Sequence, residues 1–429
     1  MINYNTFGNK IKEKIRNFSK IISQGLKKPE IKFIEALFYG VSAAQSCVLT
    51  EISRELKEDI PVKKTEERIA RNLKDFSRED EQKLQQNYVN YVKSSITDDT
   101  LIIVDPGDAT KKCSPKMESI GSVKDGSTGG FAQGYWTMGA VVLSPNNSQP
   151  IPIYEKLYPN KENGGEGLNV EVENCLQFFR DNGISEKIPR VYDRAGDSGA
   201  IFENFHRHSE SFIIRQQHNR TVIHNGKNEK IDSIVKNLEC NLTMKYTGKG
   251  GRTGTCQIGM STVFLRHFTN SKMRNFKVNL VVCKEWGEDP LVIYTNIDEP
   301  VEDIALKIVK AYLMRWRIEE MYRFKKDKLN FEGFRIRKLQ AIKTLDTLVT
   351  ILIGFIALLS DKVEQSEFSV SLIAASKRTK KLYKYIKETK FFFYAVSDGI
   401  SAVLARLRCG ISGWFKPPEP YDGQLSLVG

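Results

Sequence analysis

The sequence contains few of the residues that build zinc sites and disulfide frameworks. Its seven cysteines include no Cys-x-x-Cys pair, and its five histidines show neither a His-Glu-x-x-His motif nor zinc-finger spacing. This pattern argues against a structural zinc ion and against a disulfide-stapled fold. Dispersed cysteines without a signal peptide are typical of a protein in a reducing cytosol.

The sequence also lacks an apolar run of membrane-spanning length. Thr347–Leu359 is apolar throughout its middle, but a transmembrane helix needs ~20 residues, so we expect a buried helix and no membrane partner. Internal repeats and low-complexity tracts are absent as well. With 429 residues, the chain exceeds one typical domain and can bury a large core.

Acidic residues are outnumbered by basic ones. The chain has 65 Lys and Arg against 52 Asp and Glu, a formal net charge of +13 and a pI near 9.2. Such a chain attracts a phosphate backbone through counterion release. One basic run is usually only solvated surface, but three favour a long DNA track. The runs are residues 1–30 with seven Lys/Arg against two acids, 321–343 with eight against two, and 376–390 with seven against one.

A polar pattern lies in a stretch without Gly or Pro and contains Tyr312, Arg315, Glu319 and Lys326. At ~100° per residue on an α-helix, these side chains fall within roughly 60° of arc, with Arg323 about 20° beyond its edge. The opposite side is apolar, so the helix can bury one face and present the other. The alternative is an exposed face on which Glu, Arg and Lys simply pair.

Two aspartates follow short apolar runs that are typical of buried strands. Leu101–Val104 ends at Asp105, and Ile188–Tyr192 ends at Asp193. A strand fixes the position of such an acid while the following loop leaves it accessible. The alternative is that each Asp caps a turn, which is frequent before Gly or Pro. Two strand-end aspartates and a helix-borne glutamate together favour a site for hard divalent cations, because these need oxygen ligands.

The chain resembles the DDE transposases of bacterial insertion sequences, in the cut-and-paste group that carries a Tyr-Arg-Glu-Lys signature. Tyr312, Arg315, Glu319 and Lys326 match the signature itself. Further similarity follows in order across approximately residues 30–345. It comprises 105–111, 116–118 and 123–127 around the first acid, 134–136 and 152–154 as the next two strands, 193–198 around the second acid, and 294–296 as the strand before the signature helix.

The resemblance implies a ribonuclease-H-like catalytic core. In it, Asp105, Asp193 and Glu319 are the catalytic residues and hold two Mg²⁺ ions, with Mn²⁺ able to substitute. The sequence departs from the expected pattern at Gly107 and at Ala195-Gly196, where we expect Thr and a Gly-aromatic pair. Neither departure removes a metal ligand, so we expect activity.

The resemblance also implies DNA contacts beside the three acids. Arg315, Lys326 and Arg323 are expected to contact phosphates next to the scissile bond, and Tyr312 to hydrogen-bond a phosphate or to stack. The alternative for the cations is that they only pair with acids along the same helix.

The predicted fold is an α/β ribonuclease-H-like core with an inserted β-rich subdomain, an N-terminal helical DNA-binding domain and a helical C-terminal region. Within the insertion, four segments are typical of strands. They are Asn241–Tyr246, Thr262–Arg266, Val278–Cys283 and Leu291–Tyr294. The predicted regions are a helical DNA-end-binding domain at 1–95, the first part of the core at 96–215, the insertion at 216–299, the second part of the core with the signature helix at 300–345, and the helical C-terminal region and tail at 346–429.

The N-terminal region has helical periodicity over Ile31–Val41 and Val62–Phe76. Between these segments, Leu49–Leu56 resembles the opening of a helix-turn-helix, so we expect this region to bind the terminal inverted repeats. The alternative is a helical packing domain without base contacts.

The expected function is transposition of a mobile element. The protein would bind the ends of its element in double-stranded DNA, cleave them as a metal-dependent endonuclease and join the 3′-hydroxyl ends to target DNA. We expect a homodimer in a synaptic complex and a cytoplasmic, nucleoid-associated protein of bacterial type. Two alternatives remain, a DNA-binding regulator that lacks strand transfer and a metal-dependent DNA nuclease.

Overall fold

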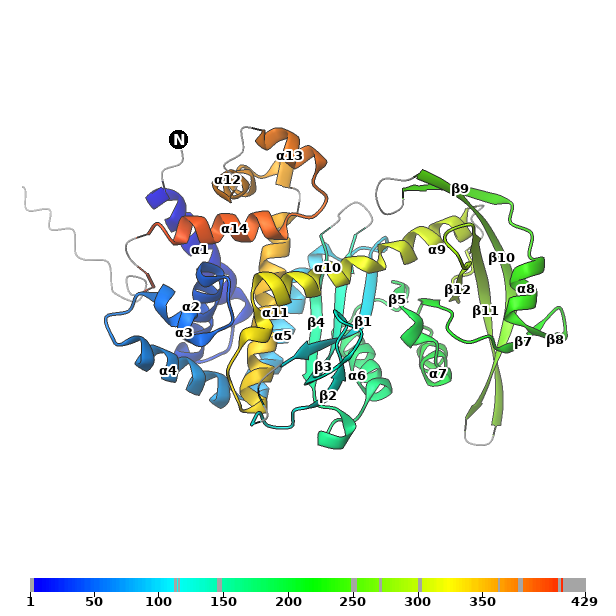
Figure 1. Cartoon of the computed structure of the whole chain (residues 1–429), viewed down its shortest axis with the longest axis horizontal. Helices are drawn as coiled ribbons and strands as arrows, with labels where there is room; N and C mark the ends of the chain where they lie inside the picture. The colour runs from blue at the N-terminus through cyan, green and yellow to red at the C-terminus, as the bar shows by residue number, and fades with distance from the viewer. Residues whose placement is uncertain are drawn as a thin grey trace, which may run out of the picture. The chain divides into compact units, whose positions relative to one another are not determined.

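The chain divides into two compact units, whose elements are labelled in Figure 1. The helical unit comprises Met1–Tyr88, Cys113–Glu118 and Phe324–Gly429, and the sheet unit comprises Val89–Lys112 and Ser119–Arg323. The computed structural model describes residues 4–111, 114, 116–144, 149–247, 253–269, 272–299, 303–361, 363–376, 381–407 and 410–411. Residues 412–429, which include the tail expected at the end of region 346–429, lie outside the described residues. Residues 377–380 of the third basic run also lie outside them.

The helical unit has α11 (Leu339–Ser360) in its core. Most residues of α11 are buried, because its sequence is apolar on all sides and it packs against α2, α4 and α14. The helices of the unit are α1 (Tyr4–Ile22), α2 (Lys28–Ala44), α3 (Leu49–Leu56), α4 (Val62–Asp75), α5 (Arg78–Val92, of which the part from Val89 onward belongs to the sheet unit), α11, α12 (Glu367–Ser376), α13 (Leu382–Glu388) and α14 (Phe393–Leu404), with short turns η6 (Phe324–Lys328), η7 (Phe331–Gly333) and η8 (Val363–Gln365).

Helix α11 is longer than the apolar run Thr347–Leu359. By length and composition its 22 residues could cross a membrane, so the prediction that this segment is too short to span is wrong. However, 83% of its most apolar window is buried inside the protein, as in the core helix of a soluble protein. The expected buried helix is therefore confirmed. The pair α2 and α3 passes the same test only if its 99° bend is counted within one span.

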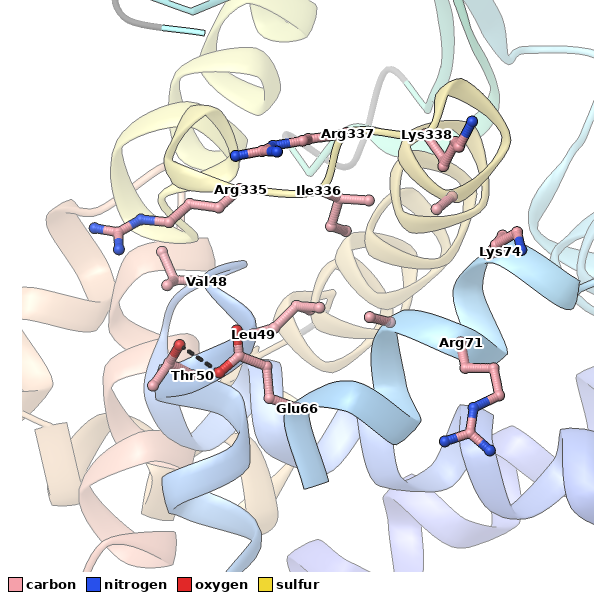
Figure 2. A pocket seen from close by; sticks show the side chains of 12 residues that line it. Val48, Leu49, Thr50, Glu66, Arg71, Lys74, Arg335, Ile336, Arg337 and Lys338 are labelled. Atoms are coloured by element: carbon pink, nitrogen blue, oxygen red, sulfur yellow. Dashed lines mark hydrogen bonds between the residues drawn. The ribbon is translucent and has the colours of Figure 1, made fainter. Parts of the chain in front are cut away.

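The helices predicted in the N-terminal region are present as α2 and α4, and α3 coincides with Leu49–Leu56. In α4 the buried residues Thr65, Ile69 and Leu73 recur every fourth position, which turns the other sides of this basic helix outward. Helices α3 and α4 line a pocket together with residues of the segment 335–341 (Figure 2).

The sheet unit contains one sheet of twelve strands among the described residues, in the order β2-β3-β1-β5-β6-β12-β11-β10-β7-β8, with β4 beside β3 and β9 beside β10. Strands β1, β5 and β6 are parallel, and the other pairs are antiparallel. The strands are β1 (Leu101–Thr110), β2 (Gly121–Lys124), β3 (Phe131–Leu143), β4 (Ile151–Tyr158), β5 (Arg190–Tyr192), β6 (Phe212–Arg215), β7 (Thr221–His224), β8 (Lys227–Lys230), β9 (Leu242–Thr247), β10 (Thr253–Thr269), β11 (Lys272–Lys284) and β12 (Leu291–Thr295).

Strand β1 continues past Asp105 to Thr110, so the prediction that it ends at this acid is wrong. The physical reason lies in its pairing. Strand β5 pairs with Ile102 and Ile103, whereas β3 pairs with β1 along its whole length. Pro106 cannot donate a ladder hydrogen bond, but it is tolerated where one side of a strand has no strand partner.

The helices of the sheet unit include the segment predicted to carry the signature. Helix α6 packs on β3, and α9 packs on β5 and β6. The elements are α6 (Leu168–Asp181), α7 (Gly199–His208), α8 (Ile231–Asn237), α9 (Ile304–Leu313) and α10 (Arg317–Arg323), with the 3₁₀ turns η1 (Lys93–Ser95), η2 (Lys161–Asn163), η3 (Arg194–Gly196) and η5 (Met314–Trp316).

All four strands predicted within residues 216–299 are present, as β9 to β12. Strand β12 pairs with β11 on one side and with β6 on the other, so these strands continue the sheet that contains β1 and β5. The mixed α/β class that the sequence predicted is confirmed.

Candidate active site

Asp105 lies in the middle of β1, opposite Gly139 of β3. Only 11% of its side chain is exposed. Arg315 Nη1 donates to Asp105 Oδ1 at 3.3 Å, and Tyr322 Oη donates to the Asp105 backbone oxygen at 2.8 Å. Residues of η5 and α10 therefore hold both the side chain and the backbone of this acid.

Two glycines leave room for Tyr322. A Cβ atom on Gly139 would overlap the Tyr322 hydroxyl, and one on Gly107 would lie 2.7 Å from Thr137 Oγ1 and 3.2 Å from Tyr322 Cζ. The glycine at 107, where the family resemblance predicts Thr, thus has a structural reason in this chain.

Asp193 follows β5 directly, as the sequence predicted. Its Oδ1 accepts a hydrogen bond from the Ala195 backbone N–H at 2.7 Å and caps the turn η3. The functional prediction and its turn-capping alternative are therefore compatible at this position, because one carboxylate can cap a turn and face a neighbouring site.

Asp197, the other acid of the second motif, has a structural role. Its Oδ2 accepts from the backbone N–H groups of Gln217 and His218 at 2.7 and 3.1 Å, and Arg220 donates to its Oδ1. The side chain of Asp197 is fully buried, and these bonds account for its burial without a ligand.

The signature segment is not one regular α-helix. Helix α9 passes into the 3₁₀ turn η5, then into α10, and from Phe324 into a π-helical turn. The predicted arc, which placed the signature side chains on one face, assumed a regular α-helix throughout and is therefore wrong in detail. Tyr312 is only 6% exposed, so it does not stand on an exposed polar face. Glu319, by contrast, has half of its side chain exposed.

Arg315 connects two of the predicted acids. It donates to Asp105 through Nη1 and to Glu319 Oε1 through Nη2. Burial alone lowers the pKa of the Arg315 guanidinium, but the charges of Asp105, Tyr312 and Glu319 raise this pKa above its usual value. The guanidinium stays charged and neutralises part of the cluster.

Burial and neighbouring charges set the pKa of Asp105. Burial raises it most, Arg315 lowers it, and Asp193 and Glu319 raise it further, to about 8. Charge effects of this kind act between near neighbours. Arg315 thus joins two of the predicted acids, and the charge of the third, Asp193, acts on Asp105. Among the charges that act on Asp105, two are carboxylates and one is a cation.

This donor set fits a hard divalent cation, because carboxylate oxygens are the ligands that Mg²⁺ and Mn²⁺ prefer. Within the part of the chain that the structure describes, no three Cys, His, Asp or Glu side chains stand ready to hold one ion. Arg315 instead bridges Asp105 and Glu319. Asp105, Asp193 and Glu319 are the residues that would hold the cation.

The sequence matches no protein-family model. The resemblance to DDE transposases therefore rests on the sequence motifs alone.

The other two predicted DNA contacts are engaged in ion pairs. Arg323 is 59% exposed and its Nη1 lies 2.9 Å from Glu320 Oε1. Lys326 belongs to the helical unit, where its Nζ lies 3.2 Å from Glu332 Oε1. The alternative for these cations was that they pair with acids along the same helix, and Arg315 and Arg323 do so. Lys326 instead pairs with Glu332, which lies beyond the π-helical turn.

Sequence reasoning missed Tyr322, although a signal for it exists. Tyr322 lies seven residues after Arg315 and three after Glu319, and residues at these spacings share one face of a helix. Its hydrogen bond to the Asp105 backbone positions β1 against α10.

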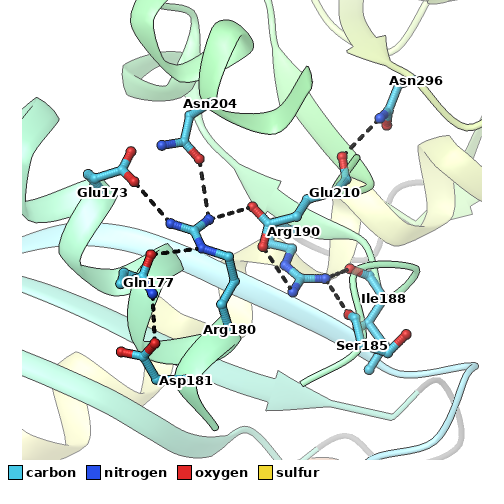
Figure 3. Close-up of polar contacts among 10 residues, drawn as sticks. All are labelled: Glu173, Gln177, Arg180, Asp181, Ser185, Ile188, Arg190, Asn204, Glu210 and Asn296. Atoms are coloured by element: carbon cyan, nitrogen blue, oxygen red, sulfur yellow. Dashed lines mark hydrogen bonds and ion pairs between the residues drawn. The ribbon is translucent and has the colours of Figure 1, made fainter. Parts of the chain in front are cut away.

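A second charge cluster, also missed, lies where β5 begins (Figure 3). Arg190 is fully buried, and its Nη2 lies 3.5 Å from Glu210 Oε1, while Arg180 Nη1 lies 3.0 Å from Glu210 Oε2. Arg190 Nη1 also donates to the backbone oxygens of Ser185 and Ile188. Burial lowers the pKa of Arg190 and raises that of Glu210. This cluster anchors the start of β5, the strand that Asp193 follows.

Proposed function

We propose that the chain is a divalent-metal-dependent DDE transposase, which cleaves the ends of its mobile element and joins the 3′-hydroxyl ends to target DNA. The observation that carries the proposal is that Arg315 joins Asp105 and Glu319, while the charge of Asp193 raises the pKa of Asp105. One of these carboxylates lies on β1, one follows β5 and one lies on α10, and two acidic charges act on Asp105 against the one cation Arg315. Such an arrangement suits a cation-dependent reaction at phosphate.

The strand order supports a ribonuclease-H-like core. Strands β4, β3 and β1 are antiparallel neighbours, and β5 and β6 follow β1 in parallel, with α6 before β5 and α7 before β6. This is the order expected of such a core. The core strands in chain order are β1, β3, β4, β5 and β6. In such a core the first acid lies on the first of these strands, as Asp105 lies on β1, and the second acid follows the fourth, as Asp193 follows β5.

Divalent cations at the three carboxylates would supply the Lewis acidity that phosphodiester hydrolysis and strand transfer need. The protein residues have complementary tasks. Arg315 holds the side chains of Asp105 and Glu319 in the cation-free chain, and once released it can offer its planar guanidinium to a phosphate. Tyr322 holds the backbone of Asp105 and so orients its carboxylate.

The remaining signature residues divide into two kinds. Buried Tyr312 lies close enough to Arg315 to raise its pKa, which supports a positioning role rather than direct contact with DNA. Exposed Arg323 can exchange its surface pair with Glu320 for a phosphate, because surface pairs of this kind contribute only about 0–1 kcal/mol. Double-stranded DNA is the proposed partner, with a homodimer joining two ends in the cytoplasm.

A cleavage assay tests the proposal directly. The DNA flanking the coding region should contain short inverted repeats, and a duplex carrying these ends should be nicked by the protein with Mg²⁺ as the only cofactor. Joining of the freed ends to a second DNA identifies a transposase. Cleavage without joining would favour the nuclease, and binding without cleavage would favour the regulator.

A further inference from the structure

A pocket of ≈ 500 Å³ opens in the helical unit, between α3, α4 and the segment that precedes α11 (Figure 2). Its floor is apolar and includes the buried residues Leu49 and Ala341. Its lining also contains five cationic side chains from two distant parts of the sequence, namely Arg71, Lys74, Arg335, Arg337 and Lys338.

Most of these cations have no acidic partner. In the described part of the chain, no carboxylate oxygen lies within 4.0 Å of the cationic groups of Arg71, Lys74, Arg335 or Arg337, and all four residues are exposed. Other cations of the basic run 321–343 differ. Lys325, Lys326 and Lys328 form ion pairs with Asp346, Glu332 and Asp398. The unbalanced charge of this run is therefore concentrated at the pocket.

The segment that contains Arg335 and Arg337 is fixed by a buried side chain and by hydrogen bonds to Glu118. Phe334 is fully buried, the Glu118 backbone N–H donates to Arg337 O at 2.9 Å, and the Leu339 N–H donates to Glu118 Oε2 at 3.1 Å. Arg335 and Arg337 are two residues apart in a segment without helical structure, and Figure 2 shows both guanidinium groups directed away from Lys338. Two guanidiniums are thus presented in a row on an anchored support.

One acid also lines the pocket, and it is already bonded. Thr50 Oγ1 donates to Glu66 Oε2 at 2.9 Å, and Figure 2 shows this pair beside Leu49, apart from Lys74 and Lys338. Lys338 has a weak partner of its own, since its Nζ lies 3.9 Å from Glu118 Oε2. The pocket therefore keeps a net positive charge that suits a polyanion lying across its rim.

We infer that this pocket binds the phosphate backbone of double-stranded DNA. The choice of duplex DNA as the polyanion rests on the proposed function, whereas the site is separate from the three acids. Arginines bind phosphate oxygens through paired N–H groups, and lysines add point charges. Such contacts position a protein on DNA and carry no sequence information themselves. The affinity that they supply depends strongly on salt.

The test is the salt dependence of duplex binding, measured by fluorescence anisotropy in EDTA so that no DNA is cut. Arg335→Gln/Arg337→Gln should make the slope of log K against log salt less steep by about 2, since each lost phosphate contact removes about 0.9. Arg71→Gln/Lys74→Gln should have a similar effect, and both losses should be equal for random and element-end duplexes.

Two controls separate lost contacts from lost structure. Arg335→Lys/Arg337→Lys keeps the charge and should keep most of the slope. Lys64→Gln removes a cation of α4 that is already paired with Glu67 at 3.1 Å, and it should leave the slope unchanged. Each variant should melt at the temperature of the parent chain, because the altered side chains are exposed.

The outcomes for this site and for the proposed function are distinguishable. Unchanged slopes in both Gln double variants, with parental melting temperatures, would overturn the pocket while leaving cleavage activity untouched. A reduced slope in a chain that cleaves no DNA would support the pocket and reject the transposase. A reduced slope on single-stranded nucleic acid alone would reject duplex DNA as the occupant.

Discussion

Two charge clusters lie at opposite ends of strand β5, and they differ in how their charges are balanced. At the start, Glu210 lies between the guanidiniums of Arg190 and Arg180, and Arg180 also pairs with Glu173, so two cations meet two carboxylates. After the end, Asp193 belongs to a group with Asp105 and Glu319, in which Arg315 is the cation that the structure places against two of the acids. A balanced buried cluster needs no ligand, whereas an excess of carboxylates invites a cation from solution.

The pKa shifts express the same difference. Burial raises the pKa of Glu210, but Arg190 and Arg180 oppose that rise. For Asp105, one arginine opposes burial while two further carboxylates add to it, and the pKa reaches about 8. Near neutral pH, Asp105 therefore holds a proton that a divalent cation can replace. We interpret the first cluster as structural and the second as functional.

The largest effect is expected from removing an acid of the unbalanced cluster. Asp105→Ala, Asp193→Ala or Glu319→Ala should each reduce DNA cleavage by more than the ~10–100-fold loss that is typical of changes beside the metal ligands. Duplex binding should persist, because the lost group does not contact the backbone. Glu320→Gln, at the neighbouring position, serves as the matched control in a gel assay of nicking. Near-normal cleavage by Glu319→Ala would show that the assignment is wrong.

Breaking the balanced cluster should instead affect stability. Arg190→Met leaves Glu210 buried with one cation fewer, and loss of one partner of a buried pair costs about 3–5 kcal/mol. Urea unfolding measures this loss. Glu173→Gln alters an exposed partner of Arg180 and should change the unfolding free energy by only about 0–1 kcal/mol. If both variants were equally stable, the structural interpretation of the first cluster would fail.

A smaller effect should appear in the pH dependence of the unbalanced cluster. The folded chain keeps the proton of Asp105 up to about pH 8, whereas the unfolded chain releases it near the ordinary aspartate pKa of 3.8. Stability without divalent cations should therefore fall as pH rises through this window. For a unit of this size, about 1 kcal/mol lowers the melting temperature by about 2–4 °C.

Thermal melting at pH 6 and pH 8.5 in EDTA measures this fall. Asp105→Asn should flatten the pH dependence of the melting temperature. Mg²⁺ should stabilise the parent chain more at pH 8.5 than at pH 6, because Asp105 is mostly ionised at pH 8.5 and the cation need not displace its proton. An identical pH dependence in Asp105→Asn and the parent chain would assign the effect to another group.

The smallest effect is expected at Lys326. Its pair with Glu332 reduces its availability, yet a phosphate contact would still contribute about 1 to the salt slope of DNA binding. Lys326→Ala should lower the slope by that amount. A slope equal to that of the parent chain would make Lys326 only a partner of Glu332.

The sequence predicted those parts of the site that depend on local signals. The strand before Asp193 and the helical segment around Glu319 follow from short apolar runs and from periodicity. The end of β1 was predicted wrongly, because Pro106 is a turn signal whose effect depends on which side of the strand is paired. Local sequence contains no information about that pairing.

Other features of the site could not be predicted from local sequence because they depend on tertiary packing, and one, Tyr322, was overlooked although the helical pattern indicates it. The burial of Tyr312 follows from the packing of α9, and the change from 3₁₀ to α to π geometry is not visible in the residue types. Arg190 and Glu210 are twenty residues apart, and nothing in their local context pairs them. Tyr322, in contrast, could have been found from its helical spacing to Arg315.

The most direct measurement is a crystal structure of the protein soaked in Mn²⁺, with anomalous differences recorded at the manganese edge. Anomalous peaks should lie within ~2.0–2.2 Å of carboxylate oxygens of Asp105, Asp193 and Glu319, with Arg315 moved away from at least one of the acids. Peaks found only elsewhere on the chain, with Arg315 still joined to Asp105 and Glu319 at saturating Mn²⁺, would contradict a metal-dependent active site at these three residues.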